Sequence, residues 1–333
     1  MVARETIVAA SDKFGSAPSP APSVPGAGRA AVLTLLAMLA FAANSILCRL
    51  ALTQTAIDPA SFTLVRIASG AASLWLIARI AGHSKSGAKS GAKPGSKPGA
   101  KSGAGSWRGA AALLAYAAAF SFAYLTMTAG TGALLLFGAV QATMILGGLS
   151  RGERLAPLQW GGLGLALGGL ALLLAPGLSA PDPLGALLMV AAGAAWGVYS
   201  LLGRASRDPI ATTAGNFLRA APMAAVLALM AALAGPHGGG HLPGGGLGWD
   251  RGGLVYAVLS GALASGVGYS IWYAALPALT AARAASVQLS VPVITALAAV
   301  LALGERITPT LAVSSIAVLG GIALVITGKT RRA

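Results

Sequence analysis

Two arginines, Arg66 and Arg219, lie inside long uncharged stretches of this chain. A charged side chain at the centre of a lipid bilayer costs at least about 2.5–3.5 kcal/mol, so the rest of the molecule must offset that free energy. Each guanidinium either attracts a carboxylate or phosphate group of a solute into a cavity, or lies close enough to a membrane face to extend into water. The sequence leaves both interpretations open for each arginine.

Uncharged polar and aromatic residues recur at helical spacing in similar stretches. In two sets of three, the members stand three and four residues apart, which places each set on one helix face. Such a face either packs between helices or lines a cavity, and a cavity of this chemistry suits a small neutral or zwitterionic solute. The two sets are Trp196, Tyr199 and Ser200, and Tyr269, Trp272 and Tyr273; the other candidates for solute contact are Asn44, Ser121, Tyr124, Gln141, Thr143, Ser286, Gln288 and Ser290.

The remaining reactive residue types do not assemble into a catalytic or metal site. The single cysteine, Cys48, lies in an apolar stretch, and the three histidines lie in glycine-rich loops. Because no nucleophile with a base and no ligand cluster falls within the apolar stretches, we expect no enzyme activity, no metal and no cofactor. The eight acids occupy tails, turns or the ends of stretches: Glu5, Asp12, Asp58, Glu153, Asp182, Asp208, Asp250 and Glu305.

The positions of the acids also bear on proton coupling. A relay of carboxylates deep in the membrane is the expected device for strong proton coupling, and the stretches contain none. A carboxylate at an interface, such as Asp58, is still available for coupling to an ion.

The elements that position these residues follow from the composition. Of the 333 residues, 56% are hydrophobic and 9% are charged, whereas soluble domains carry roughly 25% charged residues. This is too little polar surface for a globule in water, and it predicts an all-α polytopic membrane protein. Ten stretches have the length of a membrane-spanning helix: 30–51, 59–80, 109–128, 131–149, 157–175, 183–203, 211–234, 252–274, 279–303 and 309–327.

Three segments lie outside these stretches. Residues 1–28 lack the apolar core of a signal peptide and are expected to form a disordered tail, and residues 329–333 form a basic tail. Residues 84–106 carry a lysine every four residues among Gly, Ser and Pro, which prevent a stable helix. We expect a flexible cationic linker along an anionic leaflet, with docking of a specific partner as the alternative.

The distribution of basic residues predicts the orientation of the spans. The chain carries 23 Lys and Arg against 8 Asp and Glu, a net charge of +15. Most of the basic residues fall on one side if the ten spans alternate and both termini are cytoplasmic. The charge is therefore a topology signal and not a sign of nucleic-acid binding. We therefore expect an integral membrane protein with both termini in the cytoplasm.

The chain also contains an internal repeat. A shift of 152 residues places Gly152-Glu153-Arg154 on Gly304-Glu305-Arg306, and it aligns Pro157 with Pro309 and Gly168-Gly169 with Gly320-Gly321. Five spans precede the second copy, so the copies have inverted topology. We therefore expect two five-helix repeats, 29–180 and 181–328, with a binding site between them at mid-membrane and alternating access.

The acidic residue of each repeated turn has two interpretations. Glu153 and Glu305 each follow a glycine at the end of an apolar stretch and precede a proline that starts the next one. One interpretation is a helix–turn–helix junction in which the glutamate pairs locally. The other is a gate, in which the charged turn closes one mouth of the cavity.

These features together resemble the drug/metabolite transporter superfamily, and within it the EamA-type transporters. The resemblance rests on ten spans in two halves, on "DPASFTLVR" opening the second span, on "VPVITALAAVLALGERIT" across the end of the ninth, and on Gly-Glu at the same place in each half. It covers about residues 30–328. It implies secondary transport, usually outward, of amino acids, purines or related metabolites through the bacterial inner membrane.

The chain departs from the family pattern at one position. Pro292 stands where the family usually has a mid-helix proline, but its counterpart in the first half is Val140, followed by Gln141. A proline frees backbone carbonyls that can face a cavity. We therefore expect an asymmetric site, in which Pro292 acts as a hinge in one half and Gln141 supplies the polarity in the other.

Two alternatives concern the whole molecule. The chain could be a membrane scaffold or sensor that transports nothing and docks a partner through its cationic linker. The sequence also leaves open whether the protein is a monomer or a weak homodimer.

Overall fold

The computed structural model describes residues 26–87, 105–150, 152–175, 180–203, 206, 208–234, 249–279, 284, 287–327 and 331–332. The N-terminal tail and most of the lysine-rich linker lie outside this part of the chain. The first half contains α1 (Ala27–Gln54), α2 (Pro59–Gly87), α3 (Trp107–Ala123), α4 (Ala129–Leu149), β1 (Glu153–Arg154) and α5 (Pro157–Leu174). The second half contains α6 (Pro183–Gly203), α7 (Pro209–Ala234), α8 (Arg251–Val258), η2 (Leu259–Val267), α9 (Gly268–Ala275), η3 (Leu276–Ala278), α11 (Ser290–Leu303), α12 (Pro309–Thr327) and β2 (Arg331–Arg332).

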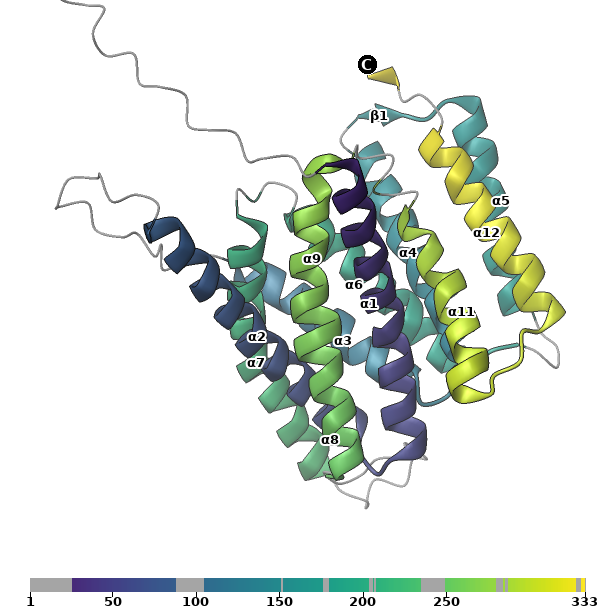
Figure 1. Ribbon diagram of the computed structural model, residues 1–333. Helices are drawn as coiled ribbons and strands as arrows, with labels where there is room; N and C mark the ends of the chain where they lie inside the picture. The colour runs from purple at the N-terminus through teal and green to yellow at the C-terminus, as the bar shows by residue number, and fades with distance from the viewer. Residues whose placement is uncertain are drawn as a thin grey trace, which may run out of the picture.

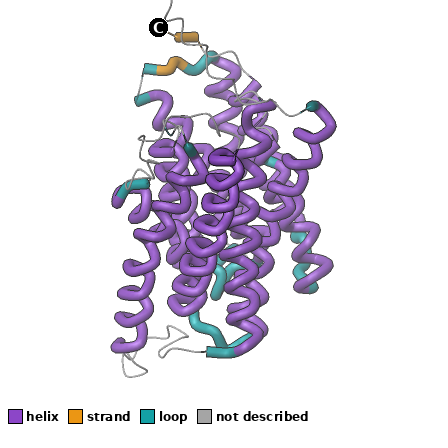
Figure 2. The backbone as a smooth tube through the Cα atoms, turned by 60° about the vertical axis from the view of Figure 1, so that its left-hand side comes forward, coloured by secondary structure: helices purple, strands orange, loops and turns teal. Residues whose placement is uncertain are grey.

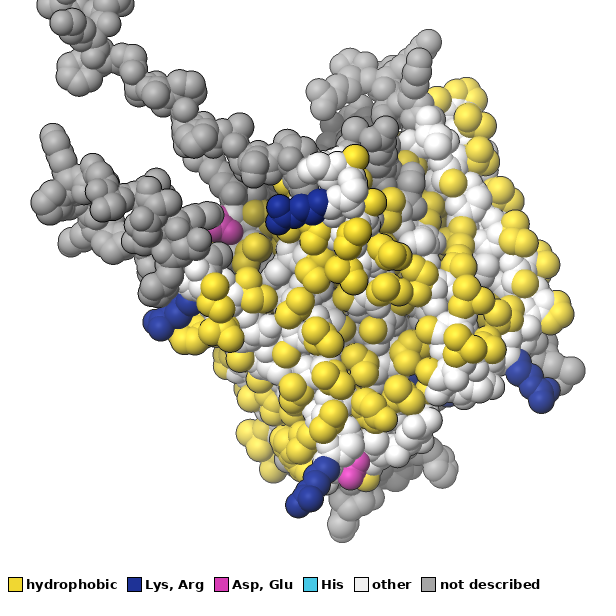
Figure 3. All heavy atoms as spheres, in the orientation of Figure 1, with side chains coloured by type: hydrophobic (Ala, Val, Ile, Leu, Met, Phe, Trp, Pro, Cys, Tyr) yellow, Lys and Arg dark blue, Asp and Glu magenta, His cyan; other side chains and the backbone are white. Residues whose placement is uncertain are grey.

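The long helices run roughly along one common direction, with the connections gathered at the two ends of the bundle (Figures 1 and 2). Eight helical segments in the described part are long and apolar enough to cross a membrane, with residues 251–278 counted as one segment. The two shorter helices are α3, with 17 residues, and α11, with 14. On the face shown in Figure 3, hydrophobic side chains cover the flank of the bundle and the charged side chains lie near its ends. The predicted all-α polytopic membrane fold is confirmed.

Several helices begin at the sequence signals that predicted them. Asp58 precedes α2, and its Oδ1 accepts hydrogen bonds from the backbone N–H groups of Ala60 and Ser61, both at 2.9 Å. In the second half, Asp208 Oδ1 accepts one at 3.1 Å from the N–H of Ala211 in α7. Because the first N–H groups of a helix have no partner within it, these carboxylates cap the second and seventh helices.

The packing has the two-fold pattern that an inverted repeat requires. α5 packs against α12, and α2 packs against α7; each of these pairs consists of counterparts in the two halves. The contact of α3 with α6 likewise corresponds to the contact of α1 with η2 and α9 in the other half. A Cβ on Gly169 would meet Val318, and one on Gly321 would meet Ala166. The 152-residue shift converts the first of these contacts into the second. The repeated glycines therefore bring α5 and α12 together about the axis that relates the halves.

Glycines spaced four residues apart lie on packed and on outward helix faces alike. Gly193 and Gly197 of α6 lie against α4, where a Cβ would meet the carbonyl oxygen of Leu136 or the side chain of Thr143. Gly164 and Gly168 of α5, which have the same spacing, face open space. The spacing alone did not distinguish a helix-packing face from an outward one, because both are rich in Gly and Ala.

The structure differs from the predicted elements in several places. The helix α2 continues to Gly87, so residues 84–87 are helical where a linker was expected. The eighth span contains the π-helix η2, which no sequence signal indicated. The ninth is interrupted at Leu289, between helical residues 287–288 and α11, so that Pro292 lies in the first turn of α11. The basic tail pairs with the repeated turn, since β2 forms an antiparallel bridge with β1.

Candidate solute cavity

A cavity of about 400 Å³ lies between the two halves of the bundle. This volume lies within the range of small-molecule sites. Both halves contribute to its wall, and it brings together residues from α1, α4, α6, α9 and the segment before α11. The predicted contact residues on this wall are Asn44, Gln141, Trp196, Tyr199, Ser200, Tyr269, Trp272, Tyr273 and Gln288.

The cavity extends to one end of the bundle. Gly203, Ser206 and Pro209, at the junction of α6 and α7, belong to its wall, as do Leu276 and Ala284, where α9 is followed by the ninth span. These junctions lie at the same end as the start of α1, at the top of Figure 1. We call this end the N-terminal face and the other end the opposite face.

Four aromatic rings form a continuous surface inside the cavity. The ring of Trp196 stacks on Tyr199 at 5.2 Å and on Tyr269 at 5.3 Å between centroids, with interplanar angles of 26° and 30°. It also lies 4.9 Å from the ring of Tyr116 in α3. The rings fix one another by these contacts, so the wall presents a flat apolar face that is formed before any solute binds.

Arg66 of α2 lies behind this wall and is 1% exposed. Its Nη2 donates a hydrogen bond of 2.7 Å to the Tyr116 hydroxyl, and its Cζ lies 5.0 and 4.9 Å from the ring centroids of Tyr116 and Phe120. Its Nη1 has no hydrogen-bond partner in the described part of the chain. Cation–π contacts offset part of the cost of burying the charge, but the described residues contribute no carboxylate to it.

The Tyr116 hydroxyl is the centre of a buried polar chain. It accepts a second hydrogen bond, 3.1 Å long, from Nδ2 of Asn44. The Oδ1 of Asn44 accepts one of 2.6 Å from the hydroxyl of Ser260, which lies in the π-helix η2. A Cβ on the neighbouring Gly261 would collide with the carbonyl oxygen of Arg66, so this glycine permits α2 and η2 to approach closely.

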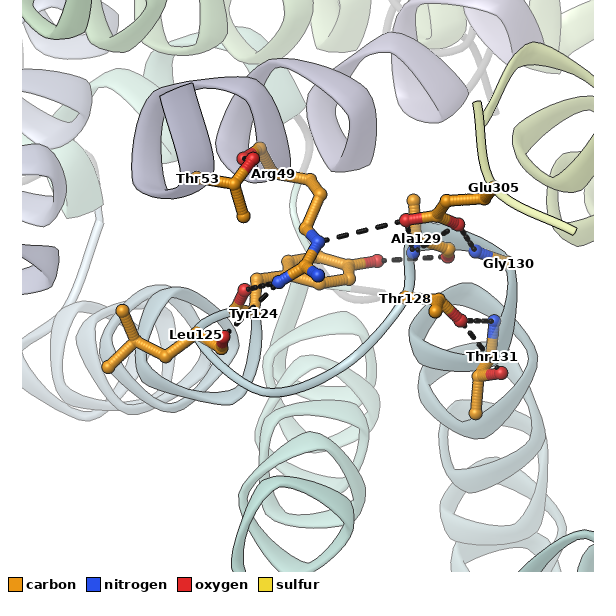
Figure 4. A network of polar contacts seen from close by, with 9 residues as sticks. All are labelled: Arg49, Thr53, Tyr124, Leu125, Thr128, Ala129, Gly130, Thr131 and Glu305. Carbon is orange, nitrogen blue, oxygen red and sulfur yellow. Dashed lines mark hydrogen bonds and ion pairs between the residues drawn. The ribbon is translucent and has the colours of Figure 1, made fainter. Parts of the chain in front are cut away.

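A second polar cluster lies toward the opposite face and links α1, α3 and α4 to the turn before α12 (Figure 4). The carboxylate of Glu305 accepts hydrogen bonds of 2.8 and 2.9 Å from the N–H of Ala129, the first residue of α4, and lies 3.7 Å from Nε of Arg49. Nη1 of Arg49 donates to the carbonyl oxygens of Tyr124 and Leu125 at 2.6 and 3.2 Å. We call Arg49, Tyr124, Ala129 and Glu305 the closure cluster. It joins α1, α3 and α4 of one half to the repeated turn of the other.

The contacts of Glu305 differ from the local pairing expected of a simple helix–turn–helix junction. The glutamate does not pair within its own turn: its carboxylate interacts with Arg49 and Ala129 in the other half of the molecule. Gly152 and Gly304, which precede the two glutamates, both have positive φ, at 87° and 66°. Glu153 lies in the backbone bridge with β2, and its side chain lies outside the described parts of the structure.

Several predicted residues lie away from the cavity wall. Tyr124 belongs to the closure cluster, and Pro292 is buried at the start of α11. The guanidinium of Arg219 donates to the carbonyl of Gly215, one turn earlier in α7. The hydroxyls of Ser121, Thr143 and Ser290 donate to carbonyls of their own helices. Ser286 is outside the described residues.

The sequence did not single out three residues that shape the cavity. Tyr116 is the most important of them, and its signal was present: Tyr116, Phe120 and Tyr124 recur every four residues and share one face of α3. Tyr124, the residue of this face that was predicted to contact the solute, lies at its outer end. Asn216 and Thr213 of α7 also line the cavity, with Asn216 accepting a 2.8 Å hydrogen bond from the backbone of Ser106.

Comparison with known proteins places this architecture among transporters. Residues 183–327, most of the second half, match the model of the EamA-like transporter family. An uncharacterized protein of Pseudomonas aeruginosa is 53% identical over 305 residues, covering 92% of this chain and 97% of its own. A protein of known crystal structure superposes with a TM-score of 0.57 at 19% identity, covering 89% of this chain and 96% of that one. That structure supports the fold alone.

Proposed function

This chain belongs to the EamA-like transporter family, and on that premise we propose that it exports a small neutral or zwitterionic metabolite, such as an amino acid or a purine-like compound, by alternating access. The observation that carries the proposal is the unequal state of the two faces. The cavity reaches the N-terminal face at the junction of α6 and α7, whereas the closure cluster seals the opposite face. A solute therefore enters from one side only in this conformation.

The orientation of the bundle supports outward transport. We take the N-terminal face as cytoplasmic, because most basic residues map to that side and cytoplasmic loops are enriched in Lys and Arg. The structure is then an inward-open state, which collects solute from the cytoplasm. Transport is completed when the closure cluster separates and the N-terminal face closes. In a bacterial cell this places the protein in the inner membrane, with both termini in the cytoplasm.

The wall of the cavity supports the solute class. Trp196, Tyr199 and Tyr269 provide a flat apolar surface, and Gln141 and Gln288 add uncharged donors and acceptors. No Asp, Glu, Lys or Arg belongs to the wall within the described residues. These groups fit a planar solute that carries its polarity in amide-like or zwitterionic groups.

A labelling experiment tests alternating access without knowledge of the solute. Cys48 is the single cysteine of the chain, so its replacement by alanine gives a background without thiols. Ser45→Cys then places one thiol at the deep end of the cavity, where Ser45 is 2% exposed. A membrane-impermeant maleimide is applied to vesicles of each orientation. We expect labelling of Ser45→Cys from both faces, faster from the N-terminal face.

Two positions control for access itself. Ser200→Cys, near the mouth, should be labelled only from the N-terminal face, and Thr128→Cys, on the far side of the closure cluster, only from the opposite face. Labelling of Ser45→Cys from the N-terminal face alone, with both controls as expected, would contradict alternating access. It would favour the alternative of a scaffold or sensor that transports nothing.

A further inference from the structure

Arg66, which lies behind the cavity wall, carries a positive charge that the described residues do not balance. Arg66 is buried, forms no ion pair within the described part of the chain, and its Nη1 lacks a hydrogen-bond partner there. A buried cation without a counter-charge is costly, and the aromatic faces of Tyr116 and Phe120 offset only part of that cost. The missing counter-charge is expected to come from a ligand.

Tyr116 connects this charge to the cavity. Its hydroxyl oxygen accepts hydrogen bonds from Arg66 and Asn44, which use its two lone pairs. The hydroxyl proton then has no acceptor among the described residues, and Tyr116 is part of the cavity wall. A phenol that accepts a hydrogen bond from a guanidinium is also polarised toward donating its own proton. The wall therefore presents one strong donor next to a hidden cation.

We propose that the transported solute carries a carboxylate, which accepts the hydrogen bond of Tyr116 and balances the charge of Arg66, while its flat body lies on Trp196 and Tyr269. This inference rests on the proposed function and narrows its solute class. Within that class, zwitterions that have an acid group fit the site, and so do simple aromatic carboxylates. Neutral compounds without an acid group do not.

The single positive charge near the cavity favours a carboxylate over a phosphate. A phosphate group is recognised by several donors at once, usually more than one Arg or a run of backbone N–H groups. The wall carries further uncharged donors, such as Gln141 and Gln288, but Arg66, behind Tyr116, supplies a single positive charge there. A monoanion matches this charge, whereas a dianion would leave a negative charge uncompensated.

Four probes of similar shape separate the acid group from the rest of the solute. They are 3-phenylpropanoate, its amide, phenylalanine and phenethylamine, titrated into full-length purified protein by calorimetry. A charge-assisted hydrogen bond predicts that the acid binds roughly 10- to 100-fold more tightly than its amide. Phenylalanine should bind like the acid and phenethylamine not at all. Acetate and inorganic phosphate serve as further probes, and tighter binding of phosphate than of the aromatic acid would overturn the proposal.

Two variants test whether the preference for the acid over the amide depends on Arg66 and Tyr116. In Arg66→Gln the acid-to-amide ratio should fall to about 1 by loss of acid affinity, because the counter-charge is gone. Tyr116→Phe should lower the ratio in the same direction, and it provides the test if Arg66→Gln fails to fold. Arg219→Gln is the matched control, since Arg219 is the other in-span arginine and is bonded to its own helix. It should leave the ratio unchanged.

The outcomes distinguish this inference from the proposed function. If acid and amide bind equally to the unmodified protein, or none of the four probes binds, the carboxylate site is wrong; two-sided labelling of Ser45→Cys in the same preparation would show that the transporter proposal stands. If the ratio is large and depends on Arg66, the site is supported. It then stands even if Ser45→Cys is labelled from one face only, and alternating access alone fails.

Discussion

Two arginines on neighbouring helices show opposite ways of placing a charge inside a membrane protein. Arg49 of α1 has an acid partner in Glu305 and two backbone carbonyls as acceptors, and its side chain is 19% exposed. Arg66 of α2 is 1% exposed and has one phenol and two aromatic faces around it. The first charge is balanced by the protein and joins its halves. The charge of Arg66 is balanced, in our proposal, by the solute that the protein binds. The region around Arg49 therefore serves closure, and the region around Arg66 serves recognition of the solute.

The largest expected effect comes from breaking the balanced region. Glu305→Ala removes the acid partner of Arg49 and the cap of α4, which together are worth about 1.5–3 kcal/mol as hydrogen bonds to a charged group. Only the conformation with a closed opposite face loses this free energy. The population open on that face should therefore rise roughly 10- to 100-fold. The measurement is the rate at which Ser45→Cys is labelled from the opposite face.

A matched variant separates the ion pair from the helix cap. Glu305→Gln keeps an oxygen that accepts from the Ala129 N–H but removes the charge facing Arg49, so its labelling rate should fall between those of the original protein and Glu305→Ala. Unchanged labelling from the opposite face in Glu305→Ala would show that the cluster does not hold that face closed. The division of roles between Arg49 and Arg66 would then fail.

A smaller effect is expected from filling the space beside Arg66. Gly261→Ala places a methyl group against the Arg66 carbonyl oxygen and the Ser69 hydroxyl, so α2 and η2 must move apart. Overpacking of this kind costs about 1–3 kcal/mol. Thermal unfolding in detergent should show a lower midpoint. Gly320→Ala is the control, because a Cβ there meets nothing within 4 Å, and equal midpoints for the two variants would refute the close approach of the helices.

The smallest effect is expected from the lysine-rich linker. Ser106, at the end of this linker, must be kept in any deletion of the segment. Its hydroxyl caps α3 by accepting from the N–H of Gly109, and its own N–H donates to Asn216 in the cavity wall. Removal of residues 88–104, bridged by a short Gly-Ser link, should leave two-sided labelling of Ser45→Cys within about two-fold of the original, as loop changes are well tolerated. If the deletion abolishes labelling of Ser45→Cys from one face or from both, that result would instead support a docking role for this segment.

The fold was predictable from the sequence because membrane spans are read from length and polarity alone. The helix start at Asp58-Pro59 agrees with the structure, and α5 packs against α12 with the symmetry that the Gly-Glu-Arg repeat predicted. The aromatic wall also followed from helical spacing, as Trp196, Tyr199 and Tyr269 lie together.

The contacts between the two halves could not be predicted from the sequence. The pairing of Glu305 with Arg49 joins residues more than 250 positions apart, and nothing local to either residue indicates it. Which of Tyr116 and Tyr124 reaches the cavity depended on where α3 ends, because about two turns of helix separate the two residues. The π-helix η2 has no residue signature in the sequence; in the structure it packs against α1 and α2.

The pairing of α5 with α12 has a consequence for how the protein is made. In the described structure α5 packs closely with α12 and only slightly with α4, and Gly162 and Gly169 form its contact surface. The ribosome completes α5 well before it starts α12 at Pro309. At about 5–20 residues per second, the fifth span waits roughly 7–30 seconds in the lipid without its main neighbour. The last helix to enter the membrane is therefore the one that completes the first half, and a chain truncated after α11 should expose α5 to quality-control proteases.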